Sequence, residues 1–519
     1  MKTLVIQRAR FGDLLQTIPL VRSLETNGED VSLLVSKDMM EISRLAFPGK
    51  EVMGFPGKGE ILERGKASLV SPAAALRETM KDLLRQSFDR IIQTNHDGTG
   101  VLLGHILKAP EKSGFLSLHE GTVEGCEEES LSGWPAYLVS SARGIRAMNR
   151  IHLSDVWTGC GLPWNRRPQA PLRKSPPPSP GAVGIVLSGR SAYRELAMED
   201  VASLAQRIQG TTGRRIVLLG RMEEREKARD LLRLVSGDVE NLVGKTSLPE
   251  LWNVVGSTLS LLISPDTGTL HLAAALGIPT LGLFFANAQP HETGAYASEA
   301  ICLTPDMDCY PCVGEGSGCV KMECRSRMDI GYVGDLARSM IEGTPLPPEQ
   351  KGLSVWKSSF EGGILSLRRI HPREATREDI LAVLYRRFFL RILEPGYPLV
   401  PLEEEFRAHA GRGWPENLSG KNLVRGTFLL SRLLEGSRER FRLSVEFPFL
   451  WPVLFHTEEV ERGRGNRETQ RRAMDALSCE AEKSMGLLHR KPFWGKKRSE
   501  VSSVPDQGGL RKNILAKGG

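Results

Sequence analysis

The chain has 519 residues, of which 40% are hydrophobic and 25% are charged, and its formal net charge at pH 7 is +7. This is the composition of an ordinary globular protein, long enough for about two or three domains with separate cores. No charge-free apolar run reaches the about 18 residues of a membrane span, and Arg8, Arg10 and Asp13 interrupt the N-terminal apolar stretch. We therefore expect a cytoplasmic protein, and the modest net charge does not indicate a nucleic-acid partner.

The N-terminal segment predicts a strand, a polar turn and a helix. An apolar strand at 4–7 is followed by apolar residues that recur at helical spacing from Leu14 to Leu24. Gly12 and Asp13 then lie where the first strand turns into the first helix, the edge at which open α/β sheets bind ligands. Asp13 is either a ligand-facing acid or a first-turn acid that the helix dipole favours.

Apolar strands alternate with helical stretches through much of the chain, which predicts parallel sheets with crossover helices. A Pro-rich segment at 167–181 is expected to link a first α/β domain at 1–166 to a second one at 182–345. The strands are expected at 4–7, 31–35, 90–93, 182–187, 215–219, 259–263 and 280–284, and the helices at 73–85, 199–209 and 223–234.

The segment 264–279 is the most informative part of the second domain. It places Asp266, Thr267, Gly268 and Thr269 at the start of a helix of small residues, directly after a buried strand. Free backbone N–H groups and the positive end of the helix dipole suit a phosphate-bearing ligand there. The alternative is a capped strand–helix connection that ends at Gly277.

Together these segments resemble glycosyltransferase family 9, the lipopolysaccharide heptosyltransferases. The resemblance rests on Gly12, Asp13, Thr17 and Pro19 and on the run 266–274. Two further stretches fit in the same order, 186–191 with Arg194, and 242–251; the likeness covers about residues 1–340. It implies an α/β protein of GT-B type, in which two Rossmann-like domains face one another across a cleft, here followed by an α-helical C-terminal extension.

The resemblance also implies a reaction and the residues that perform it. Asp13 takes the role of general base in an inverting transfer, and the N–H groups of the 267–269 turn and a cation meet the charge of the leaving diphosphate. The cation is Arg194 or Arg190, because the Lys-Arg-Trp run usual in the family is missing. The residues assigned to the donor and its phosphates are Ser188, Gly189, Arg190, Ser191, Arg194, Glu223, Asp266, Thr267, Gly268, Thr269 and His271.

Three of these assignments have structural alternatives. His271 is either a ligand contact or a packed histidine. Glu223 is expected to bind a ribose hydroxyl, Glu224 is almost as good a candidate, and both are equally well explained as first-turn acids. Gly244 and Lys245 do not form a P-loop, because the required earlier glycine is Val239; instead, Ser247 and Glu250 read as a capping box.

The expected function is transfer of a sugar, most often heptose in the family, from an ADP-sugar to a lipopolysaccharide inner-core acceptor, with the enzyme cytoplasmic or peripheral at the inner membrane. Two alternatives stay open: transfer of heptose to a protein hydroxyl, and a catalytically silent nucleotide-sugar-binding or scaffold protein. The resemblance implies no cofactor for catalysis and no nucleic-acid partner. The acceptor would be a lipid A or core oligosaccharide.

Four of the eight cysteines, Cys309, Cys312, Cys319 and Cys324, lie within sixteen positions. In a cytoplasmic protein this spacing favours a metal over disulfides, and four thiolates suit structural Zn or Fe. Relatives of the family, the autotransporter heptosyltransferases, carry a four-cysteine iron site. The alternative is a set of reduced or redox-active thiols.

The resemblance stops near residue 344. Amphipathic patterns at 378–393, 423–434 and 468–487 predict an α-helical extension over 351–490. The tail at 491–519 begins with basic residues and is expected to be flexible, although it could also touch acidic lipid headgroups.

Overall fold

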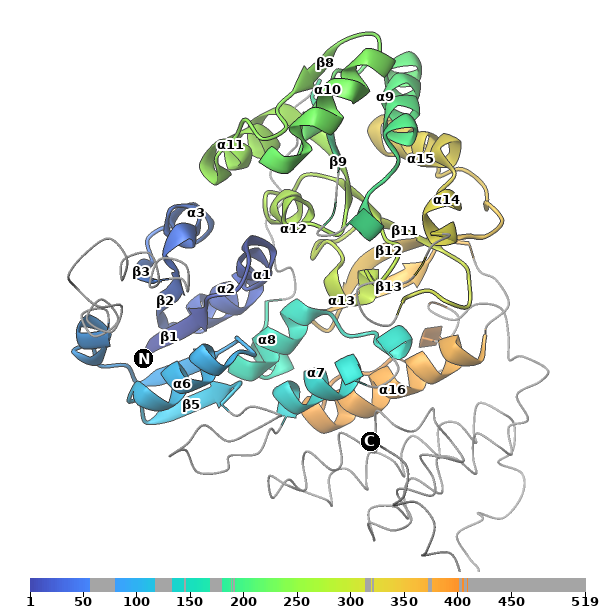
Figure 1. The fold of residues 1–519 in the computed structure, drawn as a ribbon. Helices are drawn as coiled ribbons and strands as arrows, with labels where there is room; N and C mark the ends of the chain where they lie inside the picture. The colour runs from blue at the N-terminus through green and yellow to red at the C-terminus, as the bar shows by residue number, and fades with distance from the viewer. Residues whose placement is uncertain are drawn as a thin grey trace, which may run out of the picture.

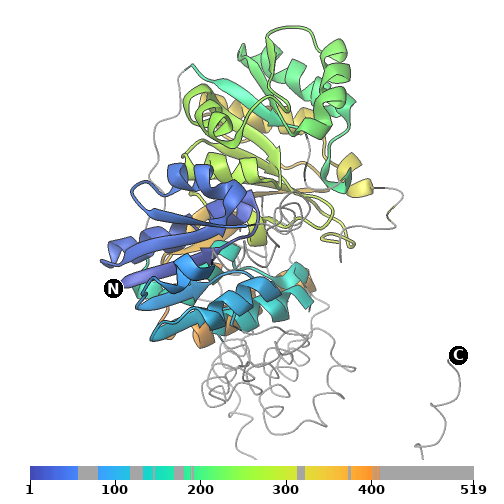
Figure 2. The ribbon, with the colours of Figure 1, turned by 60° about the vertical axis from the view of Figure 1, so that its left-hand side comes forward.

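The structure is a computed structural model that describes residues 1–56, 80–116, 133–143, 146–168, 180–187, 189, 192–312, 319, 322–371, 376–400, 404–405 and 408. The helices expected at 423–434 and 468–487, the tail and most of the Pro-rich segment lie outside these residues. None of the helices in the described ranges is long and apolar enough to cross a membrane. Figures 1 and 2 show two lobes in contact, one blue to cyan and one green to yellow.

The N-terminal lobe has a five-stranded parallel sheet in the order β3-β2-β1-β4-β5. Helices pack on the sheet, so β1 needs no polar face, and Leu4, Val5 and Ile6 are fully buried. Its strands are β1 (Lys2–Gln7), β2 (Asp30–Ser36), β3 (Glu51–Phe55), β4 (Arg90–Gln93) and β5 (Glu111–Gly114). Its helices are α1 (Phe11–Gln16), α2 (Ile18–Thr26), α3 (Met40–Ala46), α6 (Gly98–Ile106), α7 (Gly133–Arg143) and α8 (Leu153–Gly161), with short 3-10 turns η1 (Lys37–Met39), η2 (Arg146–Met148) and η3 (Trp164–Arg166).

The second lobe has an eight-stranded sheet in the order β13-β12-β11-β10-β9-β6-β7-β8. Strands β6 to β11 run parallel, whereas β12 and β13 are antiparallel to their neighbours. The strands are β6 (Ala182–Val186), β7 (Ile216–Leu219), β8 (Val239–Asn241), β9 (Leu259–Pro265), β10 (Thr280–Leu283), β11 (Ile301–Pro305), β12 (Leu353–Glu361) and β13 (Ile364–Arg369). The helices are α9 (Met198–Thr212), α10 (Arg225–Leu234), α11 (Leu248–Thr258), α12 (Gly268–Ala275), α13 (Pro290–Thr293), α14 (Glu323–Ser326) and α15 (Ile330–Glu342), with the 3-10 turns η4 (Ala192–Arg194) and η5 (Met222–Glu224).

The two-domain α/β organisation expected from the sequence is therefore confirmed, and two local predictions hold as well. Ser247 caps α11: its hydroxyl accepts the Glu250 N–H at 3.4 Å, and the Glu250 carboxylate accepts the Ser247 N–H at 2.7 Å. Gly277 follows α12 with a left-handed φ of 73°, as a glycine after a helix end often does.

The prediction of a wholly helical extension from residue 351 is wrong at its start. Residues 353–369 form the hairpin β12–β13, which adds to the edge of the second sheet beside β11. The physical reason lies in the residue types, because Val355, Trp356 and Phe360 favour a pleated surface and Gly362 and Gly363 supply the turn at positive φ. The helix expected at 378–393 is confirmed as α16 (Arg377–Leu393).

Helix α16 returns to the N-terminal lobe, where it contacts η2 and lies beside α7 (Figure 1). Its ring Phe389 packs edge-on against Tyr137 of α7 at 4.7 Å between centroids. Just beyond its end, the Glu394 carboxylate forms a buried ion pair with Arg167. Arg167 was expected to begin the Pro-rich linker. It is only 5% exposed, because it pairs with the Glu394 carboxylate in the interior.

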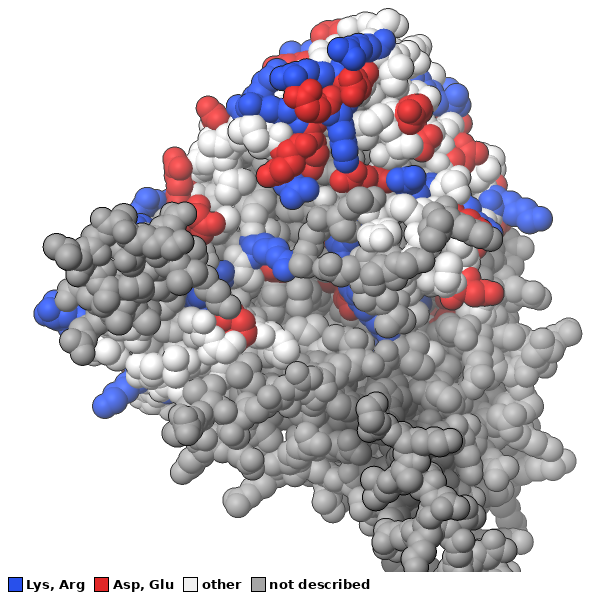
Figure 3. All heavy atoms as spheres, in the orientation of Figure 1, with Lys and Arg blue, Asp and Glu red and all other residues white. Residues whose placement is uncertain are grey.

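Charges of both signs mix on the outer surface of the second lobe. Figure 3 shows Lys and Arg next to Asp and Glu over α9 and α10. On α10, Arg229 pairs with Glu226 at 2.6 Å and Arg233 with Asp230 at 3.1 Å. These are exposed pairs three residues apart, typical of a solvated helix face rather than of a binding surface for a polyanion.

Candidate active site at the junction of the lobes

The predicted site residues follow the ends of three strands in the middle of the two sheets. β1 lies between β2 and β4, and the adjacent strands β6 and β9 lie inside the second sheet. Chains that leave neighbouring parallel strands in opposite directions open a crevice at the carboxyl edge of the sheet, where ligands bind. The Asp13 turn follows β1, the loop to Arg194 follows β6, and the Asp266 turn follows β9.

Helix α1 meets helix α12 across the junction, and two glycines make the contact. A Cβ on Gly12 would lie 3.0 Å from the His271 Cδ2 and 3.4 Å from the Gly268 Cα. A Cβ on Gly268 would lie 2.5 Å from the Phe11 Cδ1 and 3.3 Å from the Gly12 backbone N. The absence of side chains at both positions is therefore what lets the two backbones approach. The predicted Gly-Asp turn and the predicted phosphate turn come together in space.

Asp13 lies in the first turn of α1 and is half-buried. Its Oδ2 accepts the backbone N–H of Arg10 at 3.2 Å, and its backbone carbonyl accepts the Thr17 hydroxyl at 2.9 Å. The dipole of α1 favours the ionised carboxylate at this position. The position of Asp13 is thus compatible with both explanations from the sequence. As a first-turn acid it supports the helix start, and as a ligand-facing acid it lies one residue from Gly12, which contacts His271.

His271 is buried on the first turns of α12, and burial lowers its pKa to about 4. It is therefore neutral at pH 7. Its Nε2 lies 3.2 Å from the Gln16 Nε2, and 3.9 Å from Oδ1 of Asp266. Its Nδ1 has no hydrogen-bond partner among the described residues. A buried polar atom without a partner is rare in folded proteins.

The Asp266 side chain is 11% exposed and holds Arg194. The Arg194 Nη1 donates to the Asp266 Oδ2 at 2.8 Å, while its Nε donates to the Asn287 side-chain oxygen at 2.8 Å. Burial raises the pKa of Asp266, and the positive charge of Arg194 opposes that effect. Gly189 makes the arrangement fit, because a Cβ there would lie 2.4 Å from the Arg194 Cβ. Two of the three guanidinium nitrogens are thus held, and Nη2 has no hydrogen-bond partner among the described residues.

The start of α12 has no side-chain cap. Thr267 is its N-cap residue, but the Thr267 hydroxyl pairs with the Ser264 hydroxyl at 2.9 Å instead of with the helix. Gly268 and Thr269 begin the helix and carry the first N–H groups, which are oriented along the helix axis toward the turn. This is the arrangement that binds phosphate oxygens at a helix start.

The remaining predicted donor residues separate into two groups. Glu224 is buried and caps η5, with its Oε2 accepting the Arg221 N–H at 2.8 Å, whereas Glu223 is exposed. The structure therefore assigns the capping role to Glu224 and leaves Glu223 open to solvent. Ser188, Arg190 and Ser191 lie outside the described residues.

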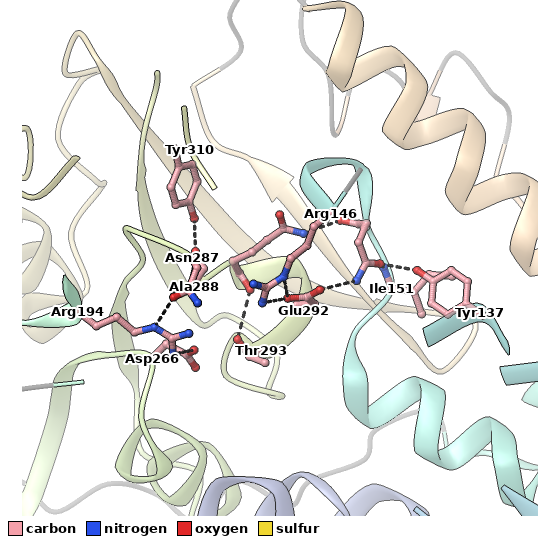
Figure 4. A network of polar contacts seen from close by, with 12 residues as sticks. Tyr137, Arg146, Ile151, Arg194, Asp266, Asn287, Ala288, Glu292, Thr293 and Tyr310 are labelled. Carbon is pink, nitrogen blue, oxygen red and sulfur yellow. Dashed lines mark hydrogen bonds and ion pairs between the residues drawn. The ribbon is translucent and has the colours of Figure 1, made fainter. Parts of the chain in front are cut away.

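Sequence reasoning missed a group of polar residues on the segment after β10. Figure 4 shows Asn287, Glu292 and Thr293 next to Arg194 and Asp266. Glu292 forms an ion pair with Arg146 of η2, so the network crosses from one lobe to the other. The local signal was weak, because Phe284, Phe285 and Ala286 follow β10 and the first polar residue after them is Asn287. Gln16, which contacts His271 over a separation of 255 positions, gave no such local signal.

The four clustered cysteines are described and are free thiols. Cys309 and Cys319 are exposed, Cys312 is half-buried and Cys324 is buried. The pKa of Cys312 is raised by burial first and then by the neighbouring thiols, so the four share one neighbourhood. Nevertheless, no three Cys, His, Asp or Glu side chains in the described ranges are placed to hold a metal ion. The metal site stays a prediction, and no step of the chemistry is derived through it.

Comparison with known structures gives low similarity scores over most of the chain. E. coli ADP-heptose lipopolysaccharide heptosyltransferase II has a TM-score of 0.48 at 17% identity, over 66% of this chain and 99% of that one. E. coli heptosyltransferase WaaC with ADP has 0.41 at 17%, over 57% and 91%. The iron-containing dodecameric glycosyltransferase TibC of enterotoxigenic E. coli has 0.31 at 12%, over 57% and 62%. Because these TM-scores are all below 0.5, only the sequence matches bear on the family of the chain.

Two sequence matches connect the chain to heptosyltransferases. Lipopolysaccharide heptosyltransferase 1 of Pseudomonas aeruginosa is 38% identical over 96 residues, which are 18% of this chain and 25% of that relative. The match thus spans about a quarter of the relative's length. Residues 179–322, from β6 through Arg194 and the Asp266–His271 turn, match the model of glycosyltransferase family 9 (heptosyltransferase). The matched part of the second lobe is therefore similar to glycosyltransferase family 9.

Proposed function

We propose that the protein is an inverting glycosyltransferase that moves a sugar, heptose in the first instance, from an ADP-sugar to a hydroxyl of a lipopolysaccharide inner-core acceptor. One observation carries the proposal: the acid-bearing start of α1 lies against the start of α12. Gly12 and Gly268 allow that contact, and it places a carboxylate from one lobe beside a phosphate-type turn of the other.

In the proposed reaction, the acceptor hydroxyl oxygen attacks the anomeric carbon of the donor as the bond from that carbon to the phosphate oxygen breaks. Asp13 takes the hydroxyl proton, and the electron pair of the broken bond leaves with ADP. Attack from the face opposite the leaving group inverts the anomeric centre. General-base help of this kind contributes about 10²–10⁴-fold in rate.

The leaving diphosphate needs stabilisation that exists before the bond breaks. The N–H groups at the start of α12 and the positive end of its dipole supply part of it. Arg194 supplies a fixed cation, since Asp266 and Asn287 hold two of its nitrogens and leave Nη2 for a phosphate oxygen. A rigid guanidinium gives up less side-chain entropy on binding than a mobile one. Glu223, exposed beyond β7, is the candidate partner of the ribose hydroxyls.

The decisive experiment is release of ADP from ADP-heptose by the full chain, with and without a heptose-deficient lipopolysaccharide acceptor. ADP-glucose and UDP-glucose serve as donor controls. We expect acceptor-dependent release with ADP-heptose and little with the other two. Binding of ADP-heptose without release, across lipid and protein acceptors, would favour a silent binding or scaffold role instead. Release that depends on a protein acceptor would move the proposal to protein heptosylation.

We also propose that the four clustered cysteines bind structural Zn or Fe, on the strength of their residue types and shared neighbourhood. The measurement is elemental analysis of anaerobically purified full-length protein, next to a Cys309→Ser/Cys312→Ser double variant. A metal content near one equivalent that falls in the double variant is expected. Metal-free wild-type protein would leave these residues as thiols.

A further inference from the structure

The segment 286–288, which follows β10, holds the arginine of the candidate active site. Its central residue, Asn287, is only 8% exposed, and the Asn287 side-chain oxygen accepts the Arg194 Nε–H at 2.8 Å. On its other side, Arg194 donates to Asp266 through Nη1. The direction of the guanidinium therefore depends on where the backbone places Asn287.

The backbone directly before Asn287 is strained. Ala286 has a φ of 56°, in the left-handed region that residues with a Cβ rarely adopt. A conformation of this kind persists only where the surrounding structure holds it. Contacts from outside the segment must therefore keep Ala286, and with it Asn287, in place.

Two hydrogen bonds from the segment 309–312 supply such contacts. The backbone N–H of Cys312 donates to the Ala286 carbonyl oxygen at 2.9 Å, and the Tyr310 hydroxyl donates to the Ala288 carbonyl oxygen at 2.8 Å. Figure 4 shows the tyrosine hydroxyl directed at this carbonyl group. The residues on both sides of the asparagine are thus held by the same segment.

The ring of Tyr310 adds apolar contact. It packs against a buried cluster that includes Phe284, which follows β10, and Leu270 and Ala274 of α12. The same side chain therefore bonds to the segment that holds the arginine and packs near the helix that starts at the phosphate-type turn. A phenylalanine ring keeps this packing, so the hydroxyl can be removed without opening a cavity.

We propose that Tyr310 is a positioning residue for Arg194. Together with the Cys312 N–H, its hydroxyl holds 286–288, and Asn287 in turn keeps the guanidinium in place for a phosphate oxygen. Only this last step, phosphate binding, rests on the proposed function. The segment 309–312 carries the first two of the four clustered cysteines, and it acts on the candidate active site through a hydroxyl and a backbone N–H, whether or not the thiols bind a metal.

The first test measures the hold on the segment directly and needs no ligand. Tyr310→Phe removes the hydroxyl and keeps the ring. Tyr332→Phe is the matched control, because the Tyr332 hydroxyl has no hydrogen-bond partner among the described residues. Hydrogen exchange of the full chain, followed by mass spectrometry, should be about three- to tenfold faster for the amides of 284–289 in Tyr310→Phe only. Unchanged exchange in α9 would show that the variant is folded, and exchange of 284–289 at the parent rate would overturn the proposal.

The second test asks whether the effect reaches Arg194. ADP affinity, measured by calorimetry, should fall about three- to tenfold in Tyr310→Phe and stay unchanged in Tyr332→Phe. In an Arg194→Met background, where the guanidinium is absent, Tyr310→Phe should cause no further loss, because the effects of residues that act through one another do not add.

An equal loss of ADP affinity in both backgrounds, or no loss in the parent background, would reject the role of Tyr310 toward Arg194. A parent chain that does not bind ADP would reject the proposed function, and the hydrogen-exchange result would then decide by itself whether Tyr310 holds 286–288.

Discussion

The two lobes meet in two regions built in opposite ways. At the glycine contact, formed by Gly12 and Gly268, bare backbones approach without side chains between them. At the crossover region, formed by α8, the start of β13 and the end of α16, buried polar groups join the chain segments. Asp155, for example, is fully buried and accepts the Tyr296 hydroxyl at 2.6 Å and the Leu365 N–H at 3.1 Å.

The two regions therefore have different roles: the crossover region stabilises the contact between the lobes, and the glycine contact determines the geometry of the candidate active site. A buried, fully bonded polar group is costly to disturb, so the crossover region should determine how stable the pair of lobes is. A close backbone contact that involves few polar groups contributes little to stability, but it determines where Asp13 lies relative to α12. We therefore expect changes at the glycine contact to alter turnover, and changes at the crossover region to alter the melting temperature.

The largest effect is expected for Asp13→Asn, which removes the base but keeps the shape of the side chain. Turnover should fall by about 10²–10⁴-fold, while ADP affinity stays within about threefold. The melting temperature should change little, because a half-buried charge at a helix start is worth at most about 2 kcal/mol and Asn can still accept the Arg10 N–H. Acceptor-dependent ADP release, calorimetric ADP binding and thermal denaturation measure the three quantities.

Asp38→Asn is the matched control for Asp13→Asn, since Asp38 is also a first-turn acid, in η1. It should leave turnover unchanged. Near-normal turnover in Asp13→Asn would reject the assignment of Asp13 as the base and reduce it to a helix-supporting acid.

The next largest effect concerns the crossover region. Arg167→Met leaves the Glu394 carboxylate, 2% exposed, without its cation, although Trp134 and the Trp164 N–H still donate to it. Breaking a buried ion pair from one side costs about 3–5 kcal/mol. Chemical denaturation should show a loss of that size in the free energy of unfolding, with the ADP affinity of the remaining folded protein unchanged.

Arg368→Met provides the comparison, because Arg368 pairs with Glu361 at 2.8 Å but is 46% exposed. An exposed pair of this kind is worth about 0–1 kcal/mol. Equal losses in the two variants would mean that burial at the crossover region does not determine stability, and the contrast between the two regions would fail.

Gly12→Ala tests the glycine contact itself. The added methyl would meet the His271 Cδ2 at 3.0 Å and Gly268 at 3.4 Å, so the lobes must shift by a few tenths of an ångström or more. Misplacement by about 1 Å can cost about 10²-fold in rate. We expect turnover to fall by about 10–100-fold, with ADP affinity and melting temperature close to those of the parent chain.

Gly210→Ala, inside α9, makes the same substitution where a Cβ meets nothing within 4 Å. It should leave turnover unchanged and slightly raise stability, because alanine is the better helix former. If both glycine variants behave alike, close approach at Gly12 has no role in the reaction.

Much of the candidate site could be predicted from the sequence because its parts are local. A buried strand, a polar turn and a small-residue helix follow one another within residues 259–275, and each has its own pattern of residue types. The strand orders of the two sheets were not predicted. The expectation that the two lobes face one another came only from the resemblance to a family.

What could not be predicted depends on partners far along the chain. The Pro-rich composition around Arg167 indicates local conformation but says nothing of Glu394, 227 positions away, which draws the arginine into the interior. The hairpin β12–β13 was not predicted for a similar reason. Its first strand pairs with β11, which lies some fifty residues earlier in the chain. In both places, contacts with residues far along the chain determine the structure, and local composition does not predict it.

The most gradual effect is expected for the pH dependence of stability at the crossover region. His152 caps α8: its Nδ1 accepts the Ser154 N–H at 3.1 Å, and its Nε2 lies 3.0 Å from the carbonyl oxygen of Gly294 in the other lobe. Burial lowers its pKa from the ordinary 6.5 to about 3, so the folded protein keeps the ring neutral while the unfolded chain takes up a proton. Stability that depends on this ring is complete above pH 6.5 and is lost as the pH falls toward 3.

The slope from this one group is at most about 1.4 kcal/mol per pH unit below pH 6.5. Asp155 works in the opposite sense, because burial raises its pKa to about 6 and acid then favours the folded state. His152→Gln, which can still accept and donate at the same places, should flatten the loss between pH 6.5 and 4 in denaturation measured at several pH values. If the variant and the parent chain lose stability in parallel over that range, His152 is not the group that titrates, and the acid sensitivity of the lobe contact originates elsewhere.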